Sequence, residues 1–173
     1  MEDADSTERQ FGEIELKLLR AKLLKEIGEI LHQISDKGDD FLYPVLDFNS
    51  PSDRLIMMSP LVKGEFMGHI YEICTNGMHP TAYVSCGDLA TYEKKEEYGE
   101  LPVHGGCTYT GNRLSTDGLW VGWDYGHYGD FMMDVGRAYP PYIGSALRNG
   151  KKWTVAEVMQ DVIRAILYIE ENK

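Results

Sequence analysis

Apolar residues recur at helical spacing in two stretches of the chain. In residues 7–35 they follow one another at steps of three and four, which predicts a long amphipathic helix that ends before Gly38. A second stripe covers residues 155–171, and Thr154 with Glu157 matches the capping-box pattern at its start. Trp153 and Val158 also fit the hydrophobic staple that often accompanies such a cap. The first stripe consists of Phe11, Leu16, Leu19, Leu23, Ile27, Ile30 and Ile34.

Short segments of β-branched and aromatic residues lie between these stripes. The segments at 66–74, 81–86, 103–109 and 119–124 are bounded by glycine, asparagine or proline, which is typical of strands. Residues 39–65 contain Pro44, Pro51 and Pro60 and predict irregular structure, with 55–58 as its strand candidate. We therefore expect an α+β fold: a small antiparallel sheet packed by a C-terminal helix, with the long N-terminal amphipathic helix as an addition. The expected division is a helical extension at 1–38 and a core domain at 39–173.

The predicted helix over residues 7–35 has two interpretations. It would be about 43 Å long at 1.5 Å per residue, which is longer than a small domain usually buries. It either docks a partner or a second copy, which would form a homodimer, or it packs across the sheet of its own domain. The sequence leaves both open.

The acidic net charge of the chain limits the classes of macromolecule that it is expected to bind. The chain of 173 residues has a formal net charge of −11, and its 43% hydrophobic share is sufficient for a core. No run of Lys and Arg is longer than two residues, and an acidic surface repels phosphates, so we expect no direct binding to nucleic acid. The same surface would attract a basic protein, or it serves only to keep the chain in solution.

Cysteine usage and hydropathy indicate the compartment. Cys74, Cys86 and Cys107 are odd in number and lack CxxC spacing, which favours free thiols in a reducing environment. The acidic residues at 1–5 are unlike a signal peptide, and no apolar run reaches the 18 residues of a membrane span. We therefore expect a cytoplasmic protein without a membrane segment.

Residues 102–130 concentrate the residue types that carry chemistry, with two histidines, two tryptophans and seven glycines. Asp124, His127 and Asp130 follow one another at steps of three, so a single turn would bring them together, with His104 arriving from a neighbouring strand. An imidazole oriented by a carboxylate is the arrangement of a general base, and we take these four as candidate catalytic residues. No cofactor is required, although the same set would suit a divalent metal. The alternative is a structural hydrogen-bond network in a glycine-rich turn.

The aromatic residues of the same stretch are candidate ligand-binding residues. Aromatic faces beside glycine-rich backbone suit a purine or another planar ligand, while protein partners and core packing use the same residue types. No dinucleotide, Walker or nucleophile-elbow motif is present. A nucleophile is not evident, because Cys107 is supported only by its spacing from His104. The candidate residues are Tyr109, Trp120, Trp123, Tyr125 and Tyr128.

A zinc site is the remaining candidate. His69, Cys74, His79 and Cys86 are spaced by five, five and seven residues, whereas structural zinc sites use tighter pairs. In a strand at 66–74, His69 and Cys74 would point to opposite faces of the sheet. We therefore expect ordinary buried thiols rather than zinc ligands.

Two sequence blocks resemble those of a widespread family of small proteins encoded by phages, prophages and bacteria. The blocks are V-H-G-G-C-T-Y-T-G at 103–111 and W-V-G-W-D-Y-G-H-Y-G-D at 120–130, and Gly68-His69, His79-Pro80 and the helix at 155–171 extend the resemblance over roughly residues 55–170. The chain departs from the pattern at Leu101-Pro102, where an acidic residue is common, and at Tyr125, where a small residue or cysteine is frequent. These departures argue against an acidic ligand or a thiol that completes a site.

The resemblance implies a role in the contest between phage and host, in the host cytoplasm. One reading is an inhibitor of a bacterial immune effector, of the anti-CRISPR type, whose acidic surface covers the basic nucleic-acid channel of a Cas effector. The other is a protein that binds or hydrolyses a small nucleotide signal in a pocket of His, Asp and aromatic residues. Charge favours the first reading, and the composition of 103–130 favours the second. The sequence alone favours the inhibitor, because it requires no nucleophile or metal.

Overall fold

The chain forms two compact units, Met1–Asp36 and Lys37–Lys173. The computed structural model describes residues 14–15, 17–19, 21–30, 32, 39–44, 46, 49–87, 100–113, 118–133 and 148–172. Among these residues, no helix is long and apolar enough to cross a membrane.

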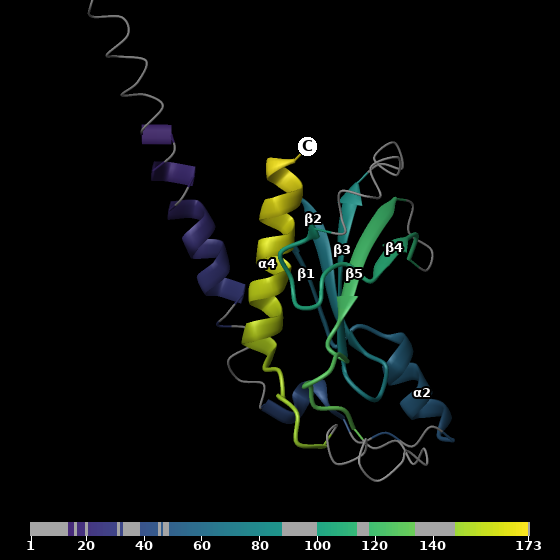
Figure 1. Ribbon diagram of the computed structural model, residues 1–173. Helices are drawn as coiled ribbons and strands as arrows, with labels where there is room; N and C mark the ends of the chain where they lie inside the picture. Colours follow the sequence, from purple (N-terminus) through teal and green to yellow (C-terminus); the bar gives the residue numbers. More distant parts are fainter. Residues whose placement is uncertain are drawn as a thin grey trace, which may run out of the picture. The chain divides into compact units, whose positions relative to one another are not determined.

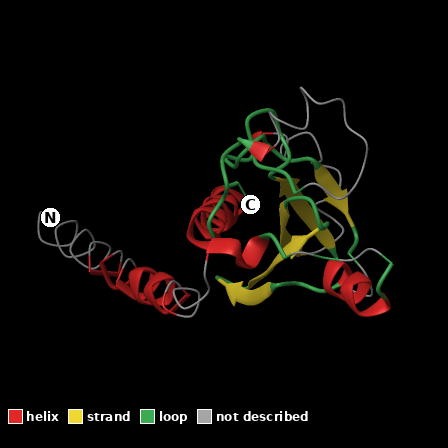
Figure 2. Ribbon diagram, turned by 90° about the horizontal axis from the view of Figure 1, so that it is seen from below, coloured by secondary structure: helices red, strands yellow, loops and turns green. Residues whose placement is uncertain are grey.

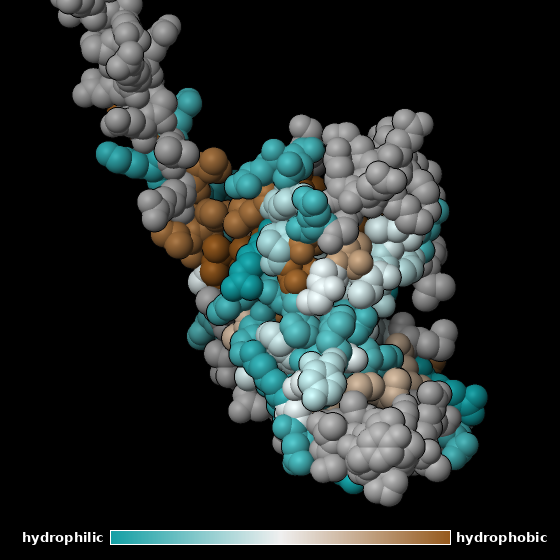
Figure 3. All heavy atoms as spheres, viewed as in Figure 1, coloured by the Kyte–Doolittle hydropathy of each residue, from teal (hydrophilic) through white to brown (hydrophobic). Residues whose placement is uncertain are grey.

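The first unit is helical at the described positions between 14 and 32, and the long helix predicted over 7–35 is not supported. Residues 7–13, 16, 20, 31 and 33–35 of that prediction lie outside the described part of the chain. Ile14, Leu18, Leu19 and Leu24 are exposed, and hydrophobic side chains are visible on this helix in Figure 3. The correction has a physical reason, because most helical stability comes from packing an apolar face and not from periodicity alone.

The second unit is built on a five-stranded antiparallel sheet in the order β1-β2-β3-β5-β4 (Figure 1). The first three strands follow one another through short turns, and β5 then pairs with β3 on one side and with the edge strand β4 on the other. The antiparallel sheet expected from the sequence is therefore confirmed. The strands are β1 (Val62–Phe66), β2 (His69–Thr75), β3 (Pro80–Gly87), β4 (Tyr109–Gly111) and β5 (Leu119–Asp124).

A two-residue turn explains the β1–β2 hairpin, which the sequence reading missed. Phe66 pairs with His69, and the two residues between them, Met67 and Gly68, have φ values of 51° and 80°. Positive φ at both central positions is the geometry of a type I′ turn, whose twist matches that of antiparallel strands. Gly68 adopts this conformation without strain.

Helix α4 (Val155–Glu171) covers one face of the sheet (Figure 2). Its predicted capping box is confirmed: the Thr154 side chain accepts a hydrogen bond from the Glu157 backbone, and the Glu157 side chain accepts one from the Thr154 backbone. The apolar stripe of the helix meets the inward residues of the central strands in the core. The buried side chains include Val158, Met159, Val162, Ala165 and Ile166 from α4 and Ile73, Ala82, Val84, Val121 and Trp123 from the sheet.

Two segments predicted as strands have another structure. Residues 55–58 end the helix α2 (Pro51–Met58), which starts at Pro51 because a proline at the first helical position needs no amide donor. In 103–109, only Tyr109 belongs to a strand. Gly105 and Gly106 have φ values of 68° and 77°, and two consecutive left-handed residues form a turn instead of an extended strand. The short helix η1 (Asp39–Leu42) precedes α2.

Candidate functional site

The turn at 103–106 presents His104 to the interior of the site. Gly106 N donates to the Val103 carbonyl oxygen over 3.1 Å, and the two left-handed glycines reverse the chain. The backbone amide of His104 donates to Oδ2 of Asp161 in α4 over 3.2 Å. The turn is therefore attached to the helix at the residue that carries the imidazole.

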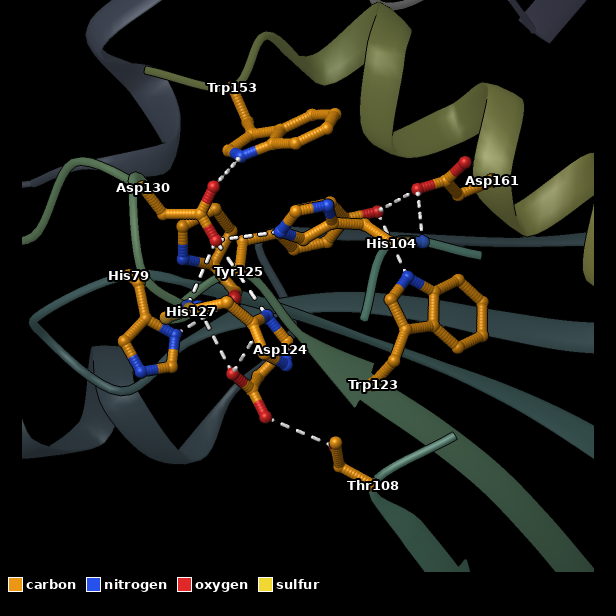
Figure 4. A network of polar contacts seen from close by, with 12 residues as sticks. His79, His104, Thr108, Trp123, Asp124, Tyr125, His127, Asp130, Trp153 and Asp161 are labelled. Atoms are coloured by element: carbon orange, nitrogen blue, oxygen red, sulfur yellow. Dashed lines mark hydrogen bonds and ion pairs between the residues drawn. The ribbon is translucent and has the colours of Figure 1, made fainter. Parts of the chain in front are cut away.

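A second turn begins where β5 ends at Asp124. Gly126 N donates to Oδ1 of Asp124 over 3.0 Å, and Asp130 N donates to the carbonyl oxygen of His127 over 3.0 Å. Gly129 has a φ of 94°, which closes this turn. The three-residue steps of the sequence thus bring Asp124, His127 and Asp130 around one turn (Figure 4).

The carboxylate of Asp130 is the centre of the site (Figure 4). Its Oδ2 accepts a hydrogen bond from His104 Nε2 over 2.7 Å and one from the His127 backbone amide over 2.9 Å. Its Oδ1 accepts a hydrogen bond from Trp153 Nε1 over 2.9 Å. Burial alone would raise the pKa of Asp130, but these three donors outweigh it and lower the pKa below its ordinary value. Asp130 is therefore a buried carboxylate that stays ionised.

The imidazole of His127 faces the same carboxylate without forming a hydrogen bond to it. Its Nδ1 lies 3.7 Å from Oδ2 of Asp130 and 3.9 Å from Oδ1 of Asp124. This nitrogen is buried and has no hydrogen-bond partner among the residues that the structure describes. The ring lies against Gly105, where an added Cβ would come within 2.1 Å of His127 Cε1. Only glycine at position 105 leaves room for the imidazole.

Asp124, like His127, lies on the more exposed side of the cluster. Its side chain is 31% exposed, and Oδ2 accepts a hydrogen bond from Thr108 Oγ1 over 3.1 Å. Nδ1 of His127 is its nearest ion-pair partner in the cluster, at 3.9 Å. The structure thus brings together all four candidate catalytic residues, with the Asp130 side chain the most buried of them.

The imidazole of His104 is held between aromatic rings. It stacks on Tyr125 with an interplanar angle of 6°, and its centroid lies 4.4 Å from that of Trp153. The hydroxyl of Tyr125 donates to Oδ2 of Asp161 over 3.1 Å and accepts from Trp123 Nε1 over 2.9 Å. Burial raises the pKa of Tyr125, and the Asp161 carboxylate raises it further. This tyrosine therefore remains protonated and supports the His104 ring.

A pocket of about 450 Å³ opens beside His104. It contains both cations and carboxylates: Lys151 Nζ lies 2.9 Å from Glu157, and Arg164 donates to Asp161 over 2.7 Å. Lys151 also lies 3.6 Å from the centre of the Trp153 ring. The lining residues are Pro102, Val103, His104, Lys151, Trp153, Glu157, Gln160, Asp161 and Arg164.

The five aromatic residues proposed as ligand contacts do not share one surface. Trp123 and Tyr125 are buried behind His104, and Trp120 is buried in the sheet. Tyr109 packs edge-on against Tyr83, and Tyr128 is fully exposed. None of the five lines the pocket, so Trp123 and Tyr125 are placed to support the site instead of contacting a ligand there.

The four residues considered as zinc ligands are not brought together. His69 contacts the Ser85 carbonyl and Glu170, whereas Cys74 contacts Arg113. His79 contacts Asn76 and the Pro80 carbonyl, and Cys86 is buried near the Val84 carbonyl. Strand alternation accounts for the separation of His69 and Cys74, which are five positions apart on β2. Each of the four has a local structural contact.

Cys107 is poorly suited to act as a nucleophile. Its thiol donates to the Tyr109 carbonyl over 3.1 Å. Burial raises the pKa of this thiol above its ordinary value, which disfavours the reactive thiolate.

Trp153 and Asp161 belong to the site although sequence reasoning did not assign them to it. Trp153 donates to Asp130 from 23 positions away, and Asp161 binds the His104 amide from 57 positions away. The sequence signal for Asp161 is a carboxylate within the apolar stripe of α4. The structure shows that only 3% of its surface is exposed. Buried carboxylates need partners, so such a position points to a polar network.

Comparison of the chain with protein-family models, with curated proteins and with solved structures found no match. The resemblance to a phage and prophage family therefore stays a prediction.

Proposed function

We propose that the protein binds a small anionic ligand, with a nucleotide as the candidate, beside His104 and acts on it by acid–base chemistry. The observation that carries the proposal is the 2.7 Å contact between His104 Nε2 and Asp130 Oδ2 at the edge of a 450 Å³ pocket. A buried carboxylate that orients an imidazole is the arrangement found in general-base sites.

The contacts of Asp130 define the chemistry of His104. Because the pKa of Asp130 is lowered, its carboxylate is ionised at neutral pH and accepts a hydrogen bond from the N–H at His104 Nε2. That tautomer leaves Nδ1 unprotonated, and Nδ1 makes no hydrogen bond to any described residue. His104 would accept a proton at Nδ1 from a water that attacks the ligand, and would return it to the leaving group.

The pocket lining supports an anionic ligand with a planar part. Lys151 and Arg164 have half-exposed side chains, so a phosphate would compete with Glu157 and Asp161 for them. The Trp153 ring lies in the same lining, and a base would stack on it in place of the Lys151 ammonium, which lies 3.6 Å from the ring centre. Together these groups support a nucleotide more than an uncharged ligand.

A thermal-shift screen tests this proposal. Nucleoside mono-, di- and triphosphates and cyclic nucleotides are each added at millimolar concentration, and the unfolding temperature is followed. A ligand at about 100 times its Kd stabilises the folded state by about 2.7 kcal/mol, which corresponds to a shift of roughly 5–10 °C in a chain of this size.

Two variants make the screen specific. His104→Gln removes the base, and we expect it to abolish both the thermal shift and any nucleotide hydrolysis. His32→Gln replaces an exposed histidine of the other unit and serves as the matched control. No shift with any nucleotide, or an equal shift in His104→Gln and wild type, would reject the proposal.

The second candidate function is inhibition of a basic host defence effector, of the anti-CRISPR type, in the host cytoplasm. The net charge of −11 favours it, because an acidic surface is complementary to a nucleic-acid channel. An assay of target DNA cleavage by Cas effectors tests it. Charge reversal of surface Asp and Glu should abolish inhibition, whereas His104→Gln should leave it intact.

A further inference from the structure

The unpaired nitrogen of His127 is the least explained feature of the site. Nδ1 is buried, lies 3.7 Å from one carboxylate and 3.9 Å from another, and forms no hydrogen bond within the described residues. A buried polar atom without a partner is costly, and in native proteins it commonly marks an ion or an ordered water. The acid–base role proposed for His104 gives His127 no task.

Three ligand atoms converge at this point. One ring nitrogen of His104, one of His127 and a carboxylate oxygen of Asp130 all lie within 4.8 Å of one another. The nitrogens that face Asp130 Oδ2 are His104 Nε2 and His127 Nδ1. An ion held at 2.0–2.2 Å by tetrahedral ligands separates them by about 3.3 Å. The His104–Asp130 distance of 2.7 Å would lengthen slightly, and the His127–Asp130 distance of 3.7 Å would shorten slightly. The side chains are therefore close to a coordinating arrangement.

We infer that His104, His127 and Asp130 form a binding site for a divalent transition-metal ion. Two imidazoles and one carboxylate suit Zn²⁺ and its neighbours in the first transition row, whereas Mg²⁺ and Ca²⁺ prefer ligands that are all oxygen. Three protein ligands also leave coordination positions open, as in catalytic metal sites. The side chains of His127 and Asp124 are 34% and 31% exposed, and water or a ligand would reach the ion from this side.

The surroundings of the three ligands match those of metal sites. Trp153 Nε1 and the His127 backbone amide donate to Asp130, and the Tyr125 ring supports the His104 imidazole. Hydrogen bonds and packing of this kind orient ligands and are a regular part of metal sites. Gly105 provides the space that the His127 ring occupies.

Metal binding would replace the proton on His104 Nε2, and the imidazole would then carry its one proton on Nδ1. A bound ion acts as a Lewis acid and activates a coordinated water, which supplies the nucleophile that the chain's own side chains lack. With the ion bound, His104 is a ligand and the coordinated water takes over as the base from His104 Nδ1. The inference therefore revises the role of His104 in the proposed function but does not depend on the ligand of the pocket.

Calorimetric titration of Zn²⁺ into the full chain, stripped of metal with EDTA, tests the site. We expect one ion per chain, and visible absorption bands of a four- or five-coordinate ion when Co²⁺ replaces Zn²⁺. His127→Ala should weaken Zn²⁺ binding at least 100-fold, whereas the control His32→Ala should bind as the wild type does. Wild-type protein that binds no ion, or equal affinity in His127→Ala and wild type, overturns the inference.

A second measurement needs no variant and so does not depend on whether His127→Ala folds. Proton–nitrogen NMR spectra of the wild-type imidazoles identify which ring nitrogens coordinate Zn²⁺. We expect His104 Nε2 and His127 Nδ1 to shift, and shifts confined to His69 and His79 overturn the inference. Nucleotide binding without Zn²⁺ binding rejects the metal site and leaves the proposed function standing. Zn²⁺ binding without nucleotide binding supports the metal site and rejects the proposed function.

Discussion

Nε2 of His104 lies 2.7 Å from Oδ2 of Asp130, although 26 positions separate the two residues. The contact joins the turn that follows Pro102 to the turn that follows β5, and Trp153 completes the set of donors around the carboxylate. Asp130 therefore carries a structural role as well as a proposed chemical one.

Asp130→Asn keeps the shape of the side chain but replaces one acceptor oxygen by a donor. At least one of the three donors around it would then be left unpaired, at a cost of about 1–3 kcal/mol. Urea unfolding measures this loss. We also expect the nucleotide-induced thermal shift to disappear. Asp124→Asn is the control, because that carboxylate is 31% exposed, against 4% for Asp130, and should cost less. Equal losses in the two variants would contradict this assignment.

Gly105→Ala tests whether the turn is shaped to hold His127. An added Cβ would lie 2.1 Å from His127 Cε1, and φ at this position is 68°. We expect a loss of about 1–3 kcal/mol from backbone strain alone, with a further loss from the displaced ring. Gly68→Ala is a matched control, since φ is 80° there but nothing lies within 4 Å of the added atom. Similar losses in urea unfolding would mean that the ring contact contributes nothing.

Tyr125→Phe tests the support beneath His104. The change keeps the stacked ring but removes the hydroxyl that joins Trp123 to Asp161. One buried donor is then left unpaired, and we expect a loss of about 1–3 kcal/mol in the free energy of unfolding. Ligand affinity should change little, because the ring still supports the imidazole. A large loss of affinity with unchanged stability would instead place the hydroxyl in the binding site.

Sequence patterns predicted the parts of the structure that depend on interactions between residues close together in the chain. Helix α4 and its capping box were predictable because helical periodicity and the Thr154–Glu157 pair act within a few residues. The approach of His127 to Asp130 followed from their three-residue spacing in a glycine-rich turn. Their roles as catalytic residues stay predictions.

The parts of the structure that the sequence did not predict depend largely on contacts between residues far apart in the chain. The donation from Trp153 to Asp130 and the contact of Asp161 with the His104 amide link distant segments. The strand predicted over 103–109 is replaced at its start by a turn, because Gly105 and Gly106 adopt left-handed conformations. Helix α2 was taken for a strand because Leu55 and Ile56 are apolar, yet both are exposed.

Glu170→Gln tests the contact that joins the end of α4 to β2. Both ring nitrogens of His69 face oxygen acceptors, Glu170 Oε1 and the Ser85 carbonyl, each at 2.5 Å. Loss of the carboxylate charge weakens a partly buried hydrogen bond, and we expect a cost of about 1.5 kcal/mol in urea unfolding. Glu171→Gln, at an exposed neighbouring position, should change stability by less than about 0.5 kcal/mol. If both variants unfold alike, His69 does not depend on Glu170.

Glu157 makes the stability of the helix start depend on pH. Burial alone would raise the pKa of this carboxyl, but the Thr154 amide and hydroxyl and the Lys151 ammonium lower it below its ordinary value. Because the folded-state pKa is lowered, the contribution of Glu157 to stability is fully present above the ordinary carboxyl pKa of the unfolded chain. It is lost as pH falls through the folded-state pKa.

Glu157→Gln should therefore cost about 0.5 kcal/mol at pH 7 through the lost charge near the helix N-terminus. Urea unfolding from pH 7 down to pH 3 should show the difference from wild type shrinking only below the ordinary carboxyl pKa. The control Glu65→Gln, on the exposed side of β1, should show no such convergence, and a constant Glu157→Gln difference across this range would contradict the charge-based cap.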